Sequence, residues 1–308
     1  MRSAAIFGLG TSHRSLAPFQ QDSAVQWIAG MPASRADADA IVVFGGDGTV
    51  HRHLSPLVAL GLPVLVVPAG SGNDFARALG LRNARESLNA WRKFAAGGNN
   101  VREIDLGVMT PTLSSQQPTG MATPVSEPLT QSTSVAQKYF CCVAGCGLDA
   151  EVTRRANQLP RWLRGHGGYA MSLPAALAKF SPFRLKVSLA DQRDGSLAAP
   201  AEQLTVLFAC ANTPVYGGGM KIAPGARLDD GKLDICHITD VDKLKLLCLF
   251  PTVYFGKHLA MKEVSYLSST RARIEAEVPL DVYADGEYVC QTPVEISVAP
   301  AVLKVIAP

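Results

Sequence analysis

The chain has 308 residues, of which 47% are hydrophobic and 18% are charged, and its formal net charge is +3. This composition excludes a disordered chain and predicts a globular protein of two domains. The small net charge and the scarcity of aromatic residues argue against a nucleic-acid partner.

The first hundred residues alternate between strand and helix signals. Short apolar runs predict buried strands at residues 4–7, 41–44 and 64–67, and helices are expected at residues 23–30, 50–60 and 73–79. Apolar runs without alternation are typical of a parallel sheet that is covered on both faces. The pattern therefore predicts an N-terminal α/β domain with a mostly parallel sheet.

The turn after the strand at 41–44 consists of Gly45, Gly46, Asp47, Gly48 and Thr49. Glycines let a phosphate group approach the backbone, and the start of the next helix attracts an anion. Asp47 is poorly suited to touch a phosphate directly, but it fits a role through Mg²⁺ or in ordering the turn. A glycine-rich turn with a capping aspartate is the simpler alternative.

A second turn follows the strand at 64–67 and contains Gly70, Ser71, Gly72, Asn73 and Asp74. Asn73 and Asp74 each fit the N-cap of the next helix. Neither turn is a Walker A loop, because no Gly-Lys-Ser/Thr follows. Two such turns at the carboxyl ends of neighbouring parallel strands predict a phosphate-binding cleft.

From residue 101 onward, strand patterns predominate. Strands are expected at residues 101–108, 138–144, 183–189, 203–211, 233–238, 270–276, 281–284 and 294–298, and helices at 162–179 and 242–261. Residues 184–189 alternate between polar and apolar side chains, which is typical of an antiparallel sheet with one solvated face. We expect a C-terminal β-sandwich domain with helical decorations.

Residues 110–137 interrupt this pattern, because 19 of these 28 residues are Ser, Thr, Pro or Gln. Such a segment cannot bury enough apolar surface to offset the entropy of ordering it. It predicts a flexible insertion in a hairpin, and a regulatory or docking segment is the alternative. The expected nucleotide-binding domain comprises residues 1–107 and about 291–308, and the β-sandwich domain comprises residues 108–290.

Several longer runs carry a family resemblance. They are PAGSGNDFARALGL at 68–81, EIDLG at 103–107, CVAGCGLDAEV at 142–152, YGGGMKIAPGARLDDGKLDI at 216–235 and ADGE at 284–287. With these runs the chain resembles the diacylglycerol-kinase catalytic family, which includes bacterial soluble lipid kinases and sphingosine kinases. The resemblance implies an NAD-kinase-like α/β domain, a β-sandwich domain and an active site in the cleft between them.

The resemblance also implies roles for single residues. ATP would lie against residues 45–49 and 70–74, and Asp47, Asp74 and Asp105 would form a water-linked network around a catalytic Mg²⁺. The residue matching the family's general base is Asp285, with Glu287 beside it, although Asp285 and Gly286 alone also fit a plain hairpin turn. A structural Mg²⁺ is implied near residues 229–233, where Asp230 is the candidate ligand.

The expected activity is Mg²⁺-dependent transfer of phosphate from ATP to the hydroxyl of a diacylglycerol-like lipid. An NAD kinase is one alternative, which the runs at 70–77 and 217–220 disfavour. A non-catalytic binding protein is another, which the retention of five acidic residues disfavours. Two departures from the family affect the nucleotide half: residues 8–12 replace the expected Asn-Pro-x-Ser-Gly turn, and Val-His-Arg-His at 50–53 lacks the usual Glu.

The remaining signals concern location and partners. The seven cysteines form no CxxC pair or zinc spacing and predict buried thiols in a reducing compartment, and the six histidines show no ligand spacing. The longest uncharged apolar segment, residues 246–256, is too short to span a membrane, for which ~20 apolar residues are needed. We expect a cytoplasmic protein with peripheral membrane contact. The segments 160–180 and 244–259 fit core helices better than interfacial ones, and a homodimer is compatible with the sequence without being specified by it.

Overall fold

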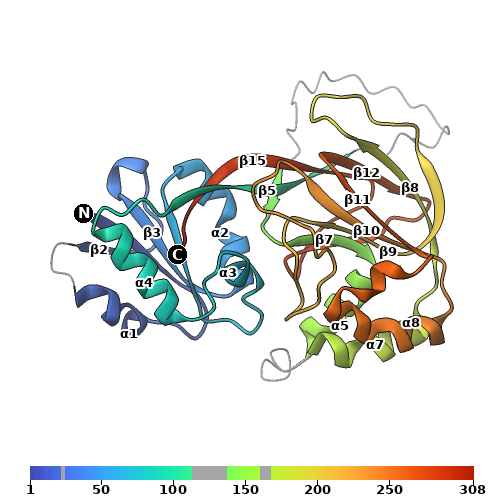
Figure 1. Ribbon diagram of the computed structural model, residues 1–308, viewed down its shortest axis with the longest axis horizontal. Helices are drawn as coiled ribbons and strands as arrows, with labels where there is room; N and C mark the ends of the chain where they lie inside the picture. Colours follow the sequence, from blue (N-terminus) through green and yellow to red (C-terminus); the bar gives the residue numbers. More distant parts are fainter. Residues whose placement is uncertain (22–24, 113–136, 160–167) are drawn as a thin grey trace, which may run out of the picture.

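The computed structural model describes residues 1–21, 25–112, 137–159 and 168–308, which form two domains side by side (Figure 1). Most of the expected insertion at 110–137 and the start of the expected helix at 162–179 therefore lie outside the described residues. In Figure 1 the N-terminal domain is on the left, and the strands β5 and β15 run from it into the C-terminal domain.

Four parallel strands form the sheet of the N-terminal domain in the order β2-β1-β3-β4. The strands are β1 (Arg2–Phe7), β2 (Gln26–Ala29), β3 (Ala40–Gly45) and β4 (Val64–Pro68). The helices are α1 (His13–Leu16), α2 (Asp47–Leu60), α3 (Asp74–Ala78) and α4 (Ala84–Ala95), with short 3₁₀ turns η1 (Ala17–Gln21) and η2 (Arg35–Asp37). All six residues of β3 are buried, which confirms that its apolar run lies between helices.

The expected helix at residues 23–30 is wrong in its described part. Gln26 to Ala29 form strand β2, which pairs in parallel with β1 at the edge of the sheet. The backbone hydrogen bonds of β1 outweigh the weak helical preference of this short segment. The strand ends at Gly30, whose φ is +88°, a conformation that glycine adopts readily.

Strands β5 (Val101–Pro111) and β15 (Val294–Ile306) pair antiparallel along most of their length and belong to both domains. At one end Val305 pairs with Val64 of β4, and at the other end β15 pairs with β12. The register between the two strands shifts between Ala299 and Leu303, and Ala301 at this bulge has a φ of +54°. The sheet is therefore continuous from one domain to the other.

The C-terminal domain is antiparallel. Its other strands are β6 (Lys138–Phe140), β7 (Val143–Gly147), β8 (Phe183–Ala190), β9 (Ala201–Ala211), β10 (Leu233–Thr239), β11 (Val264–Ser269), β12 (Arg271–Ala276), β13 (Asp281–Ala284) and β14 (Glu287–Gln291). Side chains from β5 to β10 and from β12 to β15 enclose one apolar core, which includes Phe140, Phe208 and Ile296. This enclosed core confirms the predicted β-sandwich.

Helices cover one end of the sandwich (Figure 1). They are α5 (Leu148–Gln158), α7 (Gly168–Lys179) and α8 (Lys243–Leu249), and α8 is followed by the 3₁₀ turns η3 (Phe250–Phe255) and η4 (Lys257–Ala260). The single helix expected at 242–261 is thus one helix of two turns followed by 3₁₀ segments. Within the described residues, no helix is both long enough and apolar enough to cross a bilayer.

One other feature differs from the sequence prediction. The strand expected at 138–144 is interrupted at Cys141 and Cys142, so that β6 and β7 are separate strands. This interruption frees backbone N–H groups from the sheet.

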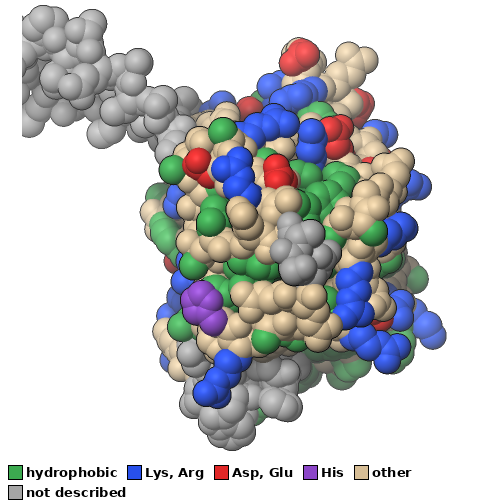
Figure 2. Space-filling model, turned by 90° about the vertical axis from the view of Figure 1, so that its left-hand side faces the viewer, with side chains coloured by type: hydrophobic (Ala, Val, Ile, Leu, Met, Phe, Trp, Pro, Cys, Tyr) green, Lys and Arg blue, Asp and Glu red, His purple; other side chains and the backbone are tan. Residues whose placement is uncertain are grey.

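Figure 2 shows the outer end of the N-terminal domain, where basic side chains are scattered around the rim with apolar ones between them, which agrees with the small net charge.

Candidate active site

The two glycine-rich turns lie in contact at the carboxyl ends of β3 and β4. Ala69 donates its backbone N–H to the carbonyl oxygen of Gly45 at 3.1 Å. A Cβ on Gly46 would lie 2.7 Å from the Cα of Gly70, and a Cβ on Gly70 would lie 2.5 Å from the Cα of Gly46, so this approach requires glycine on both sides. The predicted pair of neighbouring turns is therefore present as a single surface.

Each turn leads into a helix start. Gly46 is the N-cap of α2, and no side chain caps this end, so its first N–H groups are available to an anion. In the second turn Asn73, at a φ of 58°, accepts from the Gly70 N–H at 2.8 Å and donates to the Gly70 carbonyl at 2.7 Å. Asn73 thus closes its own turn, and its expected contact with nucleotide stays a prediction, like that of Ser71.

The side chain of Thr49 packs against two glycines, Gly45 of the first turn and Gly8. This side chain is buried, and a Cβ on Gly45 or Gly8 would lie within 2.6 Å or 2.3 Å of its Oγ1. Gly8 begins the turn that replaces the family's first phosphate loop, and it donates its N–H to the Phe44 carbonyl at 2.7 Å. Thr11 in the same turn donates its hydroxyl to the Gly8 carbonyl at 2.7 Å. This turn is packed onto the end of β3.

Asp47 and Asp74 bring two carboxyl groups to the space beside the second turn. The Asp47 carboxylate accepts from the backbone N–H groups of Asp74 and Phe75, both at 3.1 Å. Burial, and then the negative charge of Asp74, raise the pKa of Asp47 to about 6. Burial also raises the pKa of Asp74, against the lowering effect of its hydrogen bonds to the Gly218 N–H and Arg77.

This acidic pair fits a divalent cation. A Cβ on Gly72 would lie 2.8 Å from Asp47 Oδ2 and 3.7 Å from Asp74 Oδ2, so both carboxylates border the small space that glycine leaves open. Carboxylate oxygens are the ligands that Mg²⁺ prefers, and the pKa values of both acids are raised although Arg77 lies 2.8 Å from Asp74. Asp47 and Asp74 are therefore the residues that would hold Mg²⁺.

The described hydrogen bonds of the Asp105 carboxylate are with residues other than Asp47 and Asp74. This buried carboxylate accepts from the Gly231 N–H at 2.7 Å and from the Ala301 N–H at 2.8 Å. It thereby fastens the turn after residue 228 to the bulge of β15. Asp230, in that turn, accepts from the Lys232 N–H at 3.1 Å. The roles of Asp105 and Asp230 in binding Mg²⁺ stay predictions.

Asp285 occupies the turn of the β13–β14 hairpin and is surrounded by hydrogen-bond donors. With φ values of 51° and 87°, Asp285 and Gly286 form the left-handed turn that a tight hairpin requires. The carboxylate accepts from the N–H groups of Cys141 at 2.8 Å, Cys142 at 2.7 Å and Val143 at 3.3 Å. The first two of these N–H groups belong to the interruption between β6 and β7, and the third belongs to the first residue of β7.

His51 is the fourth donor to Asp285 and was missed by the sequence analysis. Its Nδ1 lies 3.0 Å from Asp285 Oδ2. Burial opposes ionisation of Asp285, but His51 and the backbone N–H groups outweigh it and hold the pKa of Asp285 below its usual value. Burial likewise lowers the pKa of His51, but Asp285 outweighs this effect and raises it. Residues 51 and 285 are far apart in sequence, and no motif connects them.

Two further contacts join the domains at this point. Glu287, which is exposed, lies so close to the first turn that a Cβ on Gly48 would be 3.0 Å from its Oε1. On the other side, Gly218 of the C-terminal domain donates its N–H to Asp74 at 2.8 Å. The predicted acids Asp47, Asp74, Asp285 and Glu287 thus line one interdomain site.

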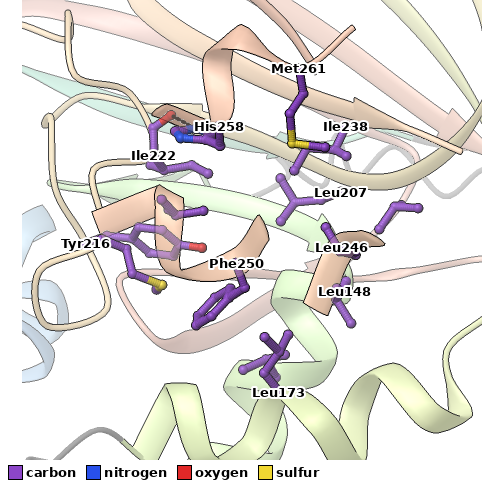
Figure 3. A pocket seen from close by; sticks show the side chains of 14 residues that line it. Leu148, Leu173, Leu207, Tyr216, Ile222, Ile238, Leu246, Phe250, His258 and Met261 are labelled. Carbon is purple, nitrogen blue, oxygen red and sulfur yellow. Dashed lines mark hydrogen bonds between the residues drawn. The ribbon is translucent and has the colours of Figure 1, made fainter. Parts of the chain in front are cut away.

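An apolar pocket lies in the C-terminal domain under the helical cap (Figure 3). Fourteen residues line it, and they come from α5, α7, β9, β10, α8, the 3₁₀ turns, the loop at 216–222 and Met261. Leu148 and Leu173 face Leu207, Ile238 and Met261 across it (Figure 3). At its rim the Tyr216 hydroxyl donates to the buried carboxylate of Asp149 at 2.6 Å.

The turn formed by residues 216–220 links this pocket to the acidic pair. Tyr216 and Met220 line the pocket and are joined by backbone hydrogen bonds of 3.0 and 2.9 Å. Between them, Gly218 reaches Asp74. The run YGGGM, which the sequence analysis used only for its resemblance, therefore connects the second glycine-rich turn to the apolar pocket.

Comparison with known proteins agrees with this arrangement. The diacylglycerol kinase catalytic domain model matches residues 15–109, and the model of the YegS C-terminal NAD kinase beta sandwich-like domain matches residues 142–307. A diacylglycerol kinase of Mycobacterium tuberculosis is 34% identical over 278 residues, covering 88% of this chain and 77% of that protein. A solved structure of a diacylglycerol kinase from Bacillus anthracis has a TM-score of 0.65 and 19% identity, covering 100% of this chain and 97% of that one.

A more distant structure shares the fold. An NAD kinase from Archaeoglobus fulgidus has a TM-score of 0.50 and 14% identity, covering 99% of this chain and 93% of that one. This likeness confirms the NAD-kinase-like architecture and says nothing about the phosphate acceptor.

Proposed function

This chain belongs to the diacylglycerol kinase family, and we propose that it transfers the γ-phosphate of ATP to the hydroxyl of a diacylglycerol-like lipid. One observation carries the lipid acceptor: the turn at 216–220 contacts both the apolar pocket and Asp74 of the nucleotide turn. A lipid with its acyl chains in that pocket would have its headgroup near the interdomain acids. An NAD acceptor would leave the apolar pocket without a use.

The residues divide this chemistry between the domains. The N–H groups at the start of α2 would bind phosphate oxygens, because a helix start favours negative charge. Asp47 and Asp74 would hold Mg²⁺, which offsets charge on the phosphates when it is bound. On the acceptor side, Asp285 and its partners would handle the proton of the lipid hydroxyl. Phosphoryl transfer needs these groups chiefly for positioning and charge stabilisation.

The test uses the purified chain, γ-labelled ATP, Mg²⁺ and a total lipid extract. The wild type should label a chloroform-soluble lipid, and Asp47→Asn should lower this labelling at least about 100-fold. NAD is offered in a parallel reaction. Labelling of NAD in place of lipid would establish the NAD kinase alternative, and ATP binding without any labelled product would establish the non-catalytic one.

Contact with a membrane surface is a second part of the proposal. Leu244 on α8 and Phe255 in η3 are exposed at 73% and 72%, beside the elements that line the pocket, and Lys243 flanks them. Apolar side chains with adjacent basic ones can lie in a bilayer interface. We expect Leu244→Gln with Phe255→Gln to lower sedimentation with anionic lipid vesicles several-fold. Val278→Gln, which changes an equally exposed side chain beside β12, is the matched control; equal loss in both would contradict the proposal.

A further inference from the structure

We propose that His51, oriented by Asp285, is the catalytic residue that accepts the proton of the acceptor hydroxyl. This inference rests on the proposed kinase function and assigns the general base of the reaction to a side chain on helix α2.

The Asp285 carboxylate has no unused lone-pair position that could accept a proton from the substrate. Its side chain is 0% exposed. Oδ1 accepts from two N–H groups, and Oδ2 accepts from the Cys141 N–H, lies 3.0 Å from His51 Nδ1 and lies 3.3 Å from the Cys141 thiol. A carboxylate offers about four lone-pair positions, and all are used here. A general base must come within hydrogen-bond reach of the proton that it takes.

His51 is the partner through which this carboxylate can act. An ionised carboxylate only accepts hydrogen bonds, so Nδ1 of His51 carries the hydrogen and Nε2 keeps its lone pair. The ring is 11% exposed, in contrast to Asp285. A carboxylate that fixes the tautomer of an imidazole and stabilises its protonated form is the arrangement that activates other hydroxyl nucleophiles.

The position of His51 suits the reaction. It lies one turn after Asp47 on α2, and Gly48, three residues before it, faces Glu287 of the hairpin. The same helix face therefore presents the phosphate-binding N-terminus and His51 to the interdomain site. Phosphate and base would thus be held by one rigid element.

The proposed step balances as follows. The acceptor O–H bond breaks and its proton forms a bond to His51 Nε2, while the oxygen lone pair forms the new bond to the γ-phosphorus. The bond from that phosphorus to the bridging oxygen breaks, and its electrons leave with ADP. Asp285 stabilises the resulting imidazolium, which returns its proton to solvent through the exposed part of the ring.

The charged groups facing His51 define a pH dependence. They are Asp285 and Glu287 from the hairpin, which favour its protonated form, and Lys138 from β6, which opposes it. Only neutral His51 accepts a proton. Activity should therefore fall as the pH drops through the pKa of His51, which lies above 6.5.

The experiment measures lipid phosphorylation from pH 5 to 9 for the wild type, His51→Asn and His53→Asn. Asparagine keeps an N–H donor for Asp285 but has no basic nitrogen. His53, whose Nδ1 lies 2.8 Å from the Thr49 carbonyl, is the matched control on the same helix. We expect His51→Asn to lower kcat about 100-fold and to abolish the acid limb, with the Kd for ATP and the Tm unchanged. His53→Asn should retain both the rate and the limb.

Activity of His51→Asn within about 3-fold of the wild type, with the same acid limb, would overturn the inference. If the variant does not fold, NMR titration of His51 in the wild-type protein replaces it. The midpoint should then coincide with the kinetic limb, and a separation of more than about one pH unit would also overturn the inference. Absence of lipid phosphorylation by the wild type would instead count against the proposed function.

Discussion

Asp47 and Asp285 are two buried acids of the interdomain site, and their pKa values are shifted in opposite directions although burial raises both. The pKa of Asp47 stays raised because burial, and then the negative charge of Asp74, outweigh its two backbone hydrogen bonds. Asp285 has a lowered pKa because three N–H groups and His51 surround it. The protein therefore leaves the first carboxylate short of positive charge and fully satisfies the second. This difference identifies a place for a cation and a place for a fixed internal anion.

The largest expected effect is on the free energy of unfolding, which should respond differently to substitution of Asp285 and of Asp47. Asp285→Asn should lower the free energy of unfolding by about 4 kcal/mol at pH 7, because the new amide would direct N–H groups at backbone donors. Asp47→Asn should stay within about 1 kcal/mol of the wild type or exceed it in EDTA, because it removes the repulsion from Asp74. Urea denaturation of both variants makes the comparison, and an equal loss in the two would refute it.

A smaller effect appears in the pH dependence of stability. The folded-state pKa of Asp47 is raised from 3.8 to about 6, so the folded protein binds this proton more tightly than the unfolded chain. Asp47 therefore costs no stability below pH 3.8 and destabilises increasingly as the pH rises through 6, by at most about 3 kcal/mol.

The measurement is the difference in unfolding free energy between the wild type and Asp47→Asn from pH 4 to 7.5 in EDTA. Asp285 has the opposite sign: its contribution is present above pH 3.8 and is lost as the pH falls through its lowered pKa. A flat difference between pH 4 and 7.5 would show that Asp47 is not destabilised in the folded state.

The smallest expected effect belongs to Glu287, which is exposed beside the hairpin. Glu287→Gln should change the free energy of unfolding by less than about 0.5 kcal/mol, because it breaks no buried contact. Its negative charge helps to raise the pKa of His51, so its loss should move the acid limb of activity to lower pH. A shift to higher pH would contradict this electrostatic role.

The sequence predicted the parts of this site that rest on local patterns. The apolar runs of β3 and β4 and the glycines after them determine two parallel strands and two helix starts. Strand β2 was misassigned because a short edge segment depends on its partner strand more than on its own composition. The interruption at Cys141 was missed because it depends on a carboxylate 144 residues away.

The same reasoning explains why His51 was overlooked. Its position after the Gly48 turn departs from the usual family pattern and was read only as the loss of a Glu. A hydrogen bond across 234 residues leaves no trace in spacing or periodicity. Only the hairpin and α2 in their folded positions show that this histidine and Asp285 form one unit.

The paired strands β5 and β15 have a mechanical consequence. In the part of the chain that the structure describes, the backbone passes from one domain to the other twice, and both passages run in this one hydrogen-bonded ribbon. Any change in the angle between the domains must therefore be taken up as bending or torsion of the ribbon. The ribbon should bend most easily at the bulge at Ala301, where the hydrogen-bond ladder between β5 and β15 is interrupted. There the Asp105 carboxylate accepts a hydrogen bond from the Ala301 N–H. Opening and closing of the cleft would thus require the β5–β15 ribbon to bend, and the hydrogen bond of Asp105 would restrain this bending.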